Sequence, residues 1–380
     1  MHAIIVGAGI GGMATAVGLG ARGHEVTLLE QAEALRFYGF GLLLQPNALH
    51  ALEILGLAEG VRAIGRPMLR TAMAFADGRP GPGLDFDPEL APVAVERARL
   101  LGVLHERLGR GVTLRTGARA EAVDALADGA RVTLAGGEEL GCDVLIGADG
   151  LHSVVRAALR GPESPRYAGY TVWRGLARGP GLAVDALREH WGRGKRFGLV
   201  PLEDELVYWF AAANAPAGQV DEPDTATALR RVFAGWPRPV LDAIERTAPG
   251  EVARLDCTDR PPIRDWGRGR VTLLGDAAHP MTPNLGQGAC QALEDAAALS
   301  LCLAAPEAEA APESALRAYE RFRAPRARSF VARSWRFGKL GQRENRVVCA
   351  LRDFALAHTP RGAMARAMKR SWAVSFDALS

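Results

Sequence analysis

The sequence predicts an α/β fold in which a parallel, doubly wound sheet is combined with a mixed β-sheet and a helical C-terminal region. Three observations predict this fold. The first thirty residues read as strand, glycine-rich turn, helix and strand. Two further short apolar segments of the buried, parallel type follow at 143–146 and 271–274. Between them, from about 167 to 213, longer strand-like segments indicate a separate, mostly antiparallel layer.

The composition is typical of an ordinary soluble globular protein of two or three domains. The chain has 380 residues, 48% apolar and 23% charged, and its net charge of +3 is too small to indicate nucleic acid or membrane as a partner. Its five cysteines show no CxxC spacing, so no disulfide framework, dithiol redox centre or metal site is predicted. The first strand starts within a few residues of Met1, and the longest apolar stretch, 296–305, is about half a bilayer span. We therefore expect a cytoplasmic protein without signal peptide or membrane span.

The N-terminal segment is predicted to form one βαβ-type unit. An apolar run at His2–Val6 is typical of a strand, and small and apolar residues at 13–19 suit a tightly packed helix. Gly23 ends that helix before a second apolar strand at Glu25–Leu29. Such a unit starts a parallel sheet.

The middle of the chain is less regular. Strands are predicted at 112–115 and 131–134, each followed by a glycine turn, and the end of 92–108 has helical spacing. A run of glycine and proline at 78–83 predicts a loop.

The antiparallel layer and most of the helical residues are predicted in the second half. Strand-like segments lie at 170–176, 196–201 and 205–213, and a helix is predicted at 289–303. Beyond 311 the chain is predicted to be helical, with 15 Lys or Arg against 5 Asp or Glu. This charge indicates either a solvated face of surface helices or a positive field that attracts anionic dinucleotides and substrates.

The first motif is a GxGxxG sequence formed by Gly7, Gly9 and Gly12, with a further glycine at Gly11. It lies directly between a predicted strand and a predicted helix, so the turn can close on a pyrophosphate whose charge sits at the helix N-terminus. Glu30 ends the second strand, where a carboxylate can accept hydrogen bonds from a ribose 2′-hydroxyl. The motif predicts binding of a dinucleotide, FAD or NAD. The alternative is a glycine-rich helix entry used only for close packing.

The second motif starts at Asp149-Gly150 and follows the apolar strand at 143–146. Its position after a buried strand is compatible with a ligand site. The alternative is an Asp-Gly turn in which Asp149 or Ser153 caps a helix.

The third motif runs from Gly275-Asp276 to Gly288 and joins a strand end to a helix start. Asp276 could accept a hydrogen bond from a polyol hydroxyl, and the backbone amides at 286–288 suit a partial negative charge. The alternative is a long loop in which Asp276 and His279 satisfy one another's backbone groups.

The order and spacing of the three motifs resemble those of the single-component FAD-dependent aromatic hydroxylases, the para-hydroxybenzoate hydroxylase-like or class A flavoprotein monooxygenases. The resemblance fades after about residue 311. It implies a Rossmann-like FAD-binding domain of the GR2 type, built from discontinuous segments at 1–68, 95–165 and 265–310. It also implies a mixed-sheet substrate domain at 69–94 and 166–264, and a C-terminal helical region at 311–380.

The resemblance further implies where FAD is held. The first motif and Glu30 would hold the ADP half, Asp149 would lie near the pyrophosphate and the nicotinamide, and Asp276 would bind the ribityl chain. The segment 39–43 resembles the family's Gly-Ala-Gly-Ile segment beside the flavin, with phenylalanine in place of alanine. The expected FAD contacts are Gly7, Gly9, Gly11, Gly12, Glu30, Gln31, Leu43, Arg97, Asp149, Asp276, Pro283, Gly286, Gln287 and Gly288.

Only one dinucleotide fingerprint is present, so NADH or NADPH is expected to bind transiently, deliver hydride and leave. The resemblance implies that O2 then gives a C4a-hydroperoxyflavin, which hydroxylates an aromatic or heteroaromatic small molecule. The alternative is an FAD-dependent reductase or dehydrogenase without oxygen insertion. The WxWxIP element of flavin halogenases is not found in the sequence. The oligomeric state is not predicted.

Within the family, the stretch from 167 to 208 is similar to FAD-dependent urate hydroxylases, in which an arginine and a tyrosine of the substrate sheet act on the purine. These roles fall on Arg196 and Tyr208, so urate hydroxylase is the leading specific expectation, although Arg174 stands where those enzymes carry an uncharged residue. The alternatives are a surface arginine in a basic loop and an amphipathic sheet residue. If the turn at 202–205 sets an even register, the two side chains lie on one face of the sheet.

Overall fold

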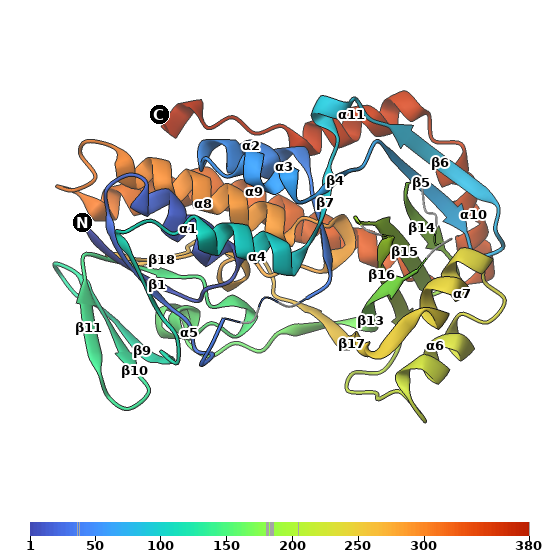
Figure 1. The fold of residues 1–380 in the computed structure, drawn as a ribbon, viewed down its shortest axis with the longest axis horizontal. Helices are drawn as coiled ribbons and strands as arrows, with labels where there is room; N and C mark the ends of the chain where they lie inside the picture. Colours follow the sequence, from blue (N-terminus) through green and yellow to red (C-terminus); the bar gives the residue numbers. More distant parts are fainter. Residues whose placement is uncertain (36, 38, 180–181, 183–185, 204, 380) are drawn as a thin grey trace.

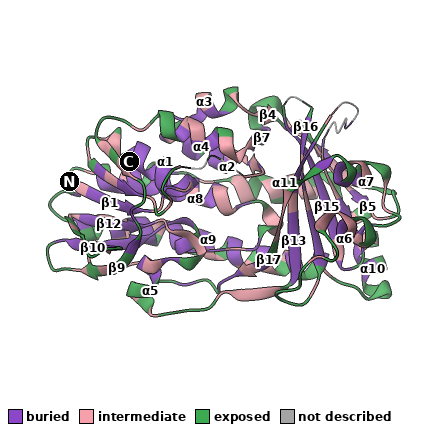
Figure 2. Ribbon diagram, turned by 60° about the horizontal axis from the view of Figure 1, so that its bottom comes forward, coloured by how far each residue is buried: buried purple, intermediate pink, exposed green. Residues whose placement is uncertain are grey.

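The computed structural model describes residues 1–35, 37, 39–179, 182, 186–203 and 205–379. The chain forms two lobes side by side, joined by the long helix α9 (Pro312–Gly341), and both termini lie on the lobe that carries the parallel sheet (Figure 1). The strands at the centre of each lobe are largely buried (Figure 2).

The first lobe contains a five-stranded parallel sheet in the order β18-β12-β1-β2-β8. The strands are short and rich in Val, Ile and Leu because both faces are buried under helices. The structure confirms the strands predicted along the chain. Their bounds are β1 (His2–Val6), β2 (Glu25–Leu29), β8 (Val112–Arg115), β12 (Val144–Gly147) and β18 (Val271–Leu273).

Helices α1 (Ile10–Gly20) and α8 (Gly288–Ala304) pack tightly against each other in this lobe. A Cβ atom at Gly18 would lie 2.2 Å from Ser300 Oγ, so the glycine permits the close approach. The other elements of the lobe are α2 (Pro46–Ile54), α3 (Ala58–Ala63), α4 (Arg97–Glu106), α5 (Val154–Arg160), and the small sheets β3-β7-β4 (Gly41–Leu44, Val93–Glu96, Arg66–Pro67) and β11-β10-β9 (Glu139–Cys142, Ala130–Leu134, Ala120–Ala125).

The second lobe is built on a seven-stranded mixed sheet in the order β17-β13-β16-β15-β14-β5-β6. One face carries Trp173, Phe197 and Trp209, which pack against α6 (Thr225–Val232) and α7 (Arg238–Glu245). The other face packs against β3 and β7 of the first lobe. The strand bounds are β5 (Arg70–Phe75), β6 (Pro80–Asp85), β13 (Arg166–Arg178), β14 (Leu187–Trp191), β15 (Lys195–Pro201), β16 (Leu206–Asn214) and β17 (Thr247–Asp259). The domain boundaries given above remain a prediction.

The prediction of a loop at 78–83 is wrong, because most of this segment belongs to strand β6. This strand runs antiparallel to β5 at the edge of the seven-stranded sheet, and the register shifts between Ala72 and Ala74. Prolines are tolerated there because an edge strand leaves one side of its backbone without a ladder partner. The composition resembles a loop, but the neighbouring strand supplies the pairing.

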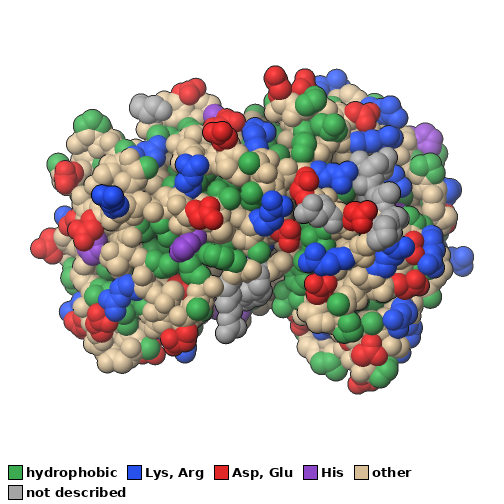
Figure 3. Space-filling model, viewed as in Figure 1, with side chains coloured by type: hydrophobic (Ala, Val, Ile, Leu, Met, Phe, Trp, Pro, Cys, Tyr) green, Lys and Arg blue, Asp and Glu red, His purple; other side chains and the backbone are tan. Residues whose placement is uncertain are grey.

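The C-terminal region is helical, as predicted, and consists of α9, α10 (Arg346–Ala357) and α11 (Arg361–Trp372). Lys and Arg side chains gather on the lobe that carries α10 and α11 (Figure 3). In the described part of the chain, none of the helices combines the length and the hydropathy needed to cross a bilayer.

Candidate active site

The three motifs meet at the carboxyl edge of the parallel sheet. The strands that precede them, β1, β12 and β18, are neighbours in that sheet and run in the same direction. A Cβ atom at Gly7 would lie 2.6 Å from the Ala148 carbonyl oxygen, and one at Gly11 would lie 2.5 Å from Leu274 Cδ2. The motifs therefore touch one another, at the position where open α/β sheets bind their ligands.

The first motif forms a tight turn that leads into α1. Gly7 has φ of +105°, and a Cβ atom at Gly12 would lie 1.9 Å from the Gly7 carbonyl oxygen, so both positions need glycine. Gly9 is the N-cap of α1 without a side-chain capping bond, and a Cβ atom there would meet no described atom within 4 Å. The start of the helix thus presents backbone N–H groups toward open space, which fits a pyrophosphate.

Glu30 is fixed at the end of β2 beside this turn. Its Oε2 accepts a hydrogen bond from the Ala8 backbone N–H at 3.1 Å, and its Oε1 accepts one from the Ala32 backbone N–H at 2.9 Å. Each oxygen has a further lone pair for a ribose hydroxyl. Gln31 follows it and is exposed.

Asp149 combines a capping role with an unused acceptor. Its Oδ2 accepts from the Val154 backbone N–H at 2.7 Å, and Ser153 caps α5 by accepting from the Arg156 backbone N–H. The helix-capping interpretation is therefore confirmed. However, Asp149 Oδ1 is buried without a hydrogen-bond partner among the described atoms, and burial raises the pKa of the carboxyl. A buried orphan acceptor fits a donor supplied by a ligand.

Asp276 follows β18 at the same edge. Within the part of the chain that the structure describes, no hydrogen bond or ion pair holds its side chain, which is exposed. Desolvation by the surrounding protein nevertheless raises the pKa of the Asp276 carboxyl. The proposed mutual contact with His279 is wrong, because His279 Nε2 lies 2.5 Å from Asp295 Oδ2 instead.

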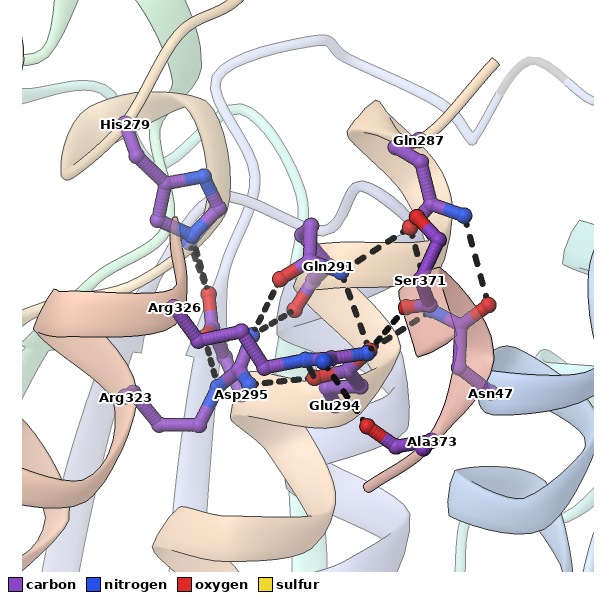
Figure 4. A network of polar contacts seen from close by, with 11 residues as sticks. Asn47, His279, Gln287, Gln291, Glu294, Asp295, Arg323, Arg326, Ser371 and Ala373 are labelled. Carbon is purple, nitrogen blue, oxygen red and sulfur yellow. Dashed lines mark hydrogen bonds and ion pairs between the residues drawn. The ribbon is translucent and has the colours of Figure 1, made fainter. Parts of the chain in front are cut away.

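A buried network of ion pairs and hydrogen bonds contacts the start of the third motif (Figure 4). Asp295 accepts from the Gly275 backbone N–H at 2.9 Å and from Arg323 Nε at 2.7 Å. Arg323, which comes from α9 and is fully buried, also pairs with Glu294. Burial disfavours the charged form of Asp295, but His279 and Arg323 outweigh it and hold the pKa below its ordinary value. This network was not predicted from the sequence.

Helix α8 begins at the last residue of the third motif, Gly288. Gly286 has φ of +61°, and a Cβ atom at Gly288 would meet no described atom within 4 Å, so the first backbone amides of the helix are accessible. The Gln287 side chain points away from this opening: it donates to Gln45 Oε1 at 2.7 Å and accepts from Asn47 Nδ2 at 3.0 Å. Only its backbone is therefore available to a ligand. Pro283, four residues earlier, is exposed.

The segment 39–43 connects this edge to the second lobe. A Cβ atom at Gly39 would lie 2.7 Å from Arg97 Cδ, and one at Gly41 would lie 2.5 Å from Tyr208 Cβ. Leu43, in β3, packs against the face of the mixed sheet that carries Tyr208. The segment that contains Leu43 thus contacts both Arg97 and Tyr208.

Arg196 and Tyr208 lie on one face of the mixed sheet. In the antiparallel pair β15–β16, Arg196 is opposite Ala212 and Val200 is opposite Tyr208, which is the even register. Four positions along a strand separate the two side chains, which corresponds to about 13 Å. Residue 204 of the connecting turn lies outside the described residues.

Arg196 is not the surface arginine of the alternative interpretation, because only 3% of its surface is exposed. Its Nε donates to Gln342 Oε1 at 3.1 Å, one terminal nitrogen donates to Glu189 Oε1 at 3.3 Å, and the other donates to Asn284 Oδ1. Burial raises the pKa of Glu189, although Arg196 opposes this shift. Arg196 therefore joins the sheet, the third motif and the end of α9.

Tyr208 has an apolar environment that includes Phe40, Leu43 and Phe210. Desolvation raises the pKa of its phenol, and Arg174 on the same face partly opposes this. The phenol therefore stays protonated at neutral pH and can donate a hydrogen bond.

Known proteins match this chain over most of its length. Residues 1–334 match a family model described as FAD binding domain. An aurachin C monooxygenase/isomerase from Stigmatella aurantiaca is 43% identical over 356 residues, which are 92% of this chain and 92% of the relative. An FAD-dependent urate hydroxylase from Klebsiella pneumoniae is 35% identical over 349 residues, which are 88% of each chain.

Solved structures show the same fold. HpxO from Klebsiella pneumoniae, complexed with FAD and uric acid, has a TM-score of 0.90 and 30% identity, and the match covers 98% of this chain and 96% of HpxO. A salicylate hydroxylase substrate complex, at 23% identity and a TM-score of 0.82, shares the fold over 100% of this chain and 97% of its own. The predicted α/β fold and FAD as the cofactor are thereby confirmed. This chain belongs to the FAD binding domain family and is an FAD-dependent monooxygenase of class A.

Proposed function

We propose that this enzyme uses NADH or NADPH and O2 to hydroxylate a heteroaromatic ring held against the mixed sheet. The balanced reaction consumes substrate, O2, NAD(P)H and one proton, and gives hydroxylated substrate, water and NAD(P)+. The single observation that carries the proposal is the face shared by Arg196 and Tyr208, beside the edge where the three motifs meet. We also propose that the enzyme works in the cytoplasm.

FAD supplies the redox chemistry when bound, since it takes hydride from a nicotinamide and activates O2. The pyrophosphate fits the open N-terminus of α1, and the Glu30 carboxylate is oriented to accept from a ribose hydroxyl. Asp149 Oδ1 and the unpaired Asp276 carboxylate are acceptors without a protein donor in the described chain. The accessible amides at the start of α8 stabilise partial negative charge.

Arg196 is proposed to orient the substrate. A guanidinium has five N–H donors, and its three contacts leave two of them for a ring oxygen or nitrogen. Glu189 balances its charge, so the substrate does not have to be an anion. Tyr208 is proposed to donate a hydrogen bond from its protonated phenol.

The leading candidate substrate is aurachin C, because a relative named as an aurachin C monooxygenase/isomerase is 43% identical. The apolar cluster beside Tyr208, which includes Phe40, Leu43, Leu176 and Phe210, favours a substrate with apolar surface. Urate is the second candidate, because a relative named as a urate hydroxylase is 35% identical.

The test is turnover of the purified holoenzyme with aurachin C and with urate. NAD(P)H oxidation, O2 uptake and product mass are measured together. We expect a product heavier by one oxygen atom with at least one of the two compounds. NAD(P)H oxidation without O2 uptake would instead support the reductase alternative.

Substitution of Arg196 by alanine is expected to weaken substrate binding by roughly 10- to 100-fold, because a charge-assisted hydrogen bond contributes about 1.5–3 kcal/mol. It is also expected to uncouple NAD(P)H oxidation from hydroxylation. The ratio of product to oxidised NAD(P)H checks this. The double variant Arg196→Met/Glu189→Met is the control, because the single variant leaves Glu189 buried without its ion pair. If the double variant couples NAD(P)H oxidation to hydroxylation as well as the wild type does, Arg196 serves only as the ionic partner of Glu189 and does not orient the substrate.

Substitution of Gly12 by alanine is expected to give protein that purifies with little FAD, since the new Cβ atom would lie 1.9 Å from the Gly7 carbonyl oxygen. The matched control is Gly102→Ala in α4, where a Cβ atom would meet no described atom within 4 Å. The ratio of flavin absorbance to protein absorbance compares the two. Equal FAD content in both variants would show that the turn does not contact the cofactor.

A further inference from the structure

Helix α10 presents an apolar face to solvent. Val347, Leu351 and Phe354 are 68%, 65% and 64% exposed, and their spacing of four and three residues places them on one side of the helix. Cys349 and Arg352 on the opposite side are buried. A helix that faces water normally shows the reverse arrangement.

Exposed hydrophobic side chains are concentrated on this part of the chain. Eleven large hydrophobic side chains are exposed in the described chain, and five of them belong to α10 or to the end of α9. These five are Leu340, Val347, Val348, Leu351 and Phe354. In Figure 2 most of α10 is exposed.

The segment that carries the apolar face is rich in exposed positive charge. The segment 343–372 has one exposed acid, Glu344, and α11 contains no Asp or Glu. The exposed cations of the segment are Arg343, Arg346, Arg361, Arg366, Lys369 and Arg370.

The protein holds α10 firmly in place. Terminal nitrogens of the buried Arg352 donate to the Gly192 carbonyl oxygen at 2.9 Å and to the Gly341 carbonyl oxygen at 3.2 Å. Its guanidinium also lies 5.2 Å from the centre of the Trp191 ring, and Trp191 is opposite Arg196 in the mixed sheet. The outward face therefore cannot turn inward without breaking buried contacts.

A second copy of the chain fits this surface poorly. A stable dimer buries about 800 Å² per partner, which exceeds what a few side chains of a twelve-residue helix offer. The exposed cations of the segment 343–372 would also repel the same segment on another copy. An anionic lipid surface, by contrast, accepts apolar side chains to a depth of about 5–10 Å and attracts the cations at its headgroups.

We infer that α10 and α11 dock this enzyme onto an anionic membrane surface, with Val347, Leu351 and Phe354 inserted and the exposed Arg and Lys of the segment 343–372 at the headgroups. The inference does not depend on the identity of the substrate. It describes association with a surface and requires no membrane-spanning helix.

Co-sedimentation of the FAD-loaded protein with vesicles tests the inference. We expect binding to vesicles of phosphatidylcholine mixed with phosphatidylglycerol, little binding to phosphatidylcholine alone, and weaker binding as salt is raised. The double variant Leu351→Glu/Phe354→Glu should bind at least about ten-fold less, because two side chains lose their apolar transfer. Val220→Glu, at a site 67% exposed on the lobe but outside α10, is the matched control and should bind normally.

The charge component is tested by Arg366→Glu/Lys369→Glu, which should abolish the preference for phosphatidylglycerol. Absence of wild-type binding, or equal binding by the α10 variant, would overturn the inference. So would light scattering that shows a dimer lost in Leu351→Glu/Phe354→Glu. The pelleting assay does not measure hydroxylation, so its result is independent of the proposed reaction.

Discussion

Replacing Asp276 by alanine is expected to give a protein that loses most of its FAD during purification. The carboxylate lies at the carboxyl edge of the parallel sheet and has no protein partner in the described chain. Its hydrogen bond to a ribityl hydroxyl would contribute about 1.5–3 kcal/mol, so affinity should fall roughly 10- to 100-fold. Titration of the apoprotein with FAD, followed by flavin fluorescence, measures the change.

Two variants separate this effect from general damage. Asp276→Asn keeps an oxygen acceptor and should retain more FAD than Asp276→Ala. Asp128→Ala removes an exposed acid from the turn between β9 and β10 and should bind FAD normally. Undiminished FAD affinity in Asp276→Ala would remove Asp276 from the cofactor site.

Replacing Arg323 by methionine is expected to cause the largest loss of stability. Arg323 is fully buried and is paired with both Glu294 and Asp295. Removal of one partner of a buried ion pair costs about 3–5 kcal/mol. In this variant Glu294 keeps only Arg326, and Asp295 keeps only His279, as ionic partners among the described residues. We expect the Tm of the holoenzyme to fall by roughly 5–15 °C. Arg321→Met, an exposed position on the same helix, should change the free energy of unfolding by less than about 0.5 kcal/mol.

The pH dependence of this variant gives a second check. Burial disfavours ionised Glu294 and Asp295, but their cationic partners hold both pKa values below the ordinary range. The resulting stability is present above about pH 4 and is lost as pH falls through the folded-state pKa values. The difference in Tm between wild type and Arg323→Met should therefore be largest near neutral pH and shrink in acid. A difference that grows in acid would contradict the ionic role of Arg323.

The elements that the sequence predicted well are those with a local signature. The parallel strands are short apolar runs, and their order along the chain places Gly7, Asp149 and Asp276 after strand ends. Strand β6 was missed because its Gly and Pro residues resemble a loop, and only its place at the edge of the mixed sheet makes it a strand. Local composition cannot supply that information.

The polar network behind the third motif was missed for a related reason. Its members, Glu294 and Asp295 on α8 and Arg323 on α9, are far apart in the sequence and meet only when the two helices pack. One signal was present: two adjacent acids interrupt an otherwise apolar helix. Buried acids require partners, so this pair could have predicted a buried cation. The side-chain roles of Arg196 and Tyr208 remain predictions.

The amount of FAD bound per chain tests most directly whether the three strand-end motifs form one cofactor site. It is measured from the flavin absorbance released when the purified protein is denatured. We predict a yellow protein with one FAD per chain, and Gly12→Ala and Asp276→Ala variants that bind much less. A colourless protein that takes up no FAD from excess cofactor would contradict the assignment of these loops.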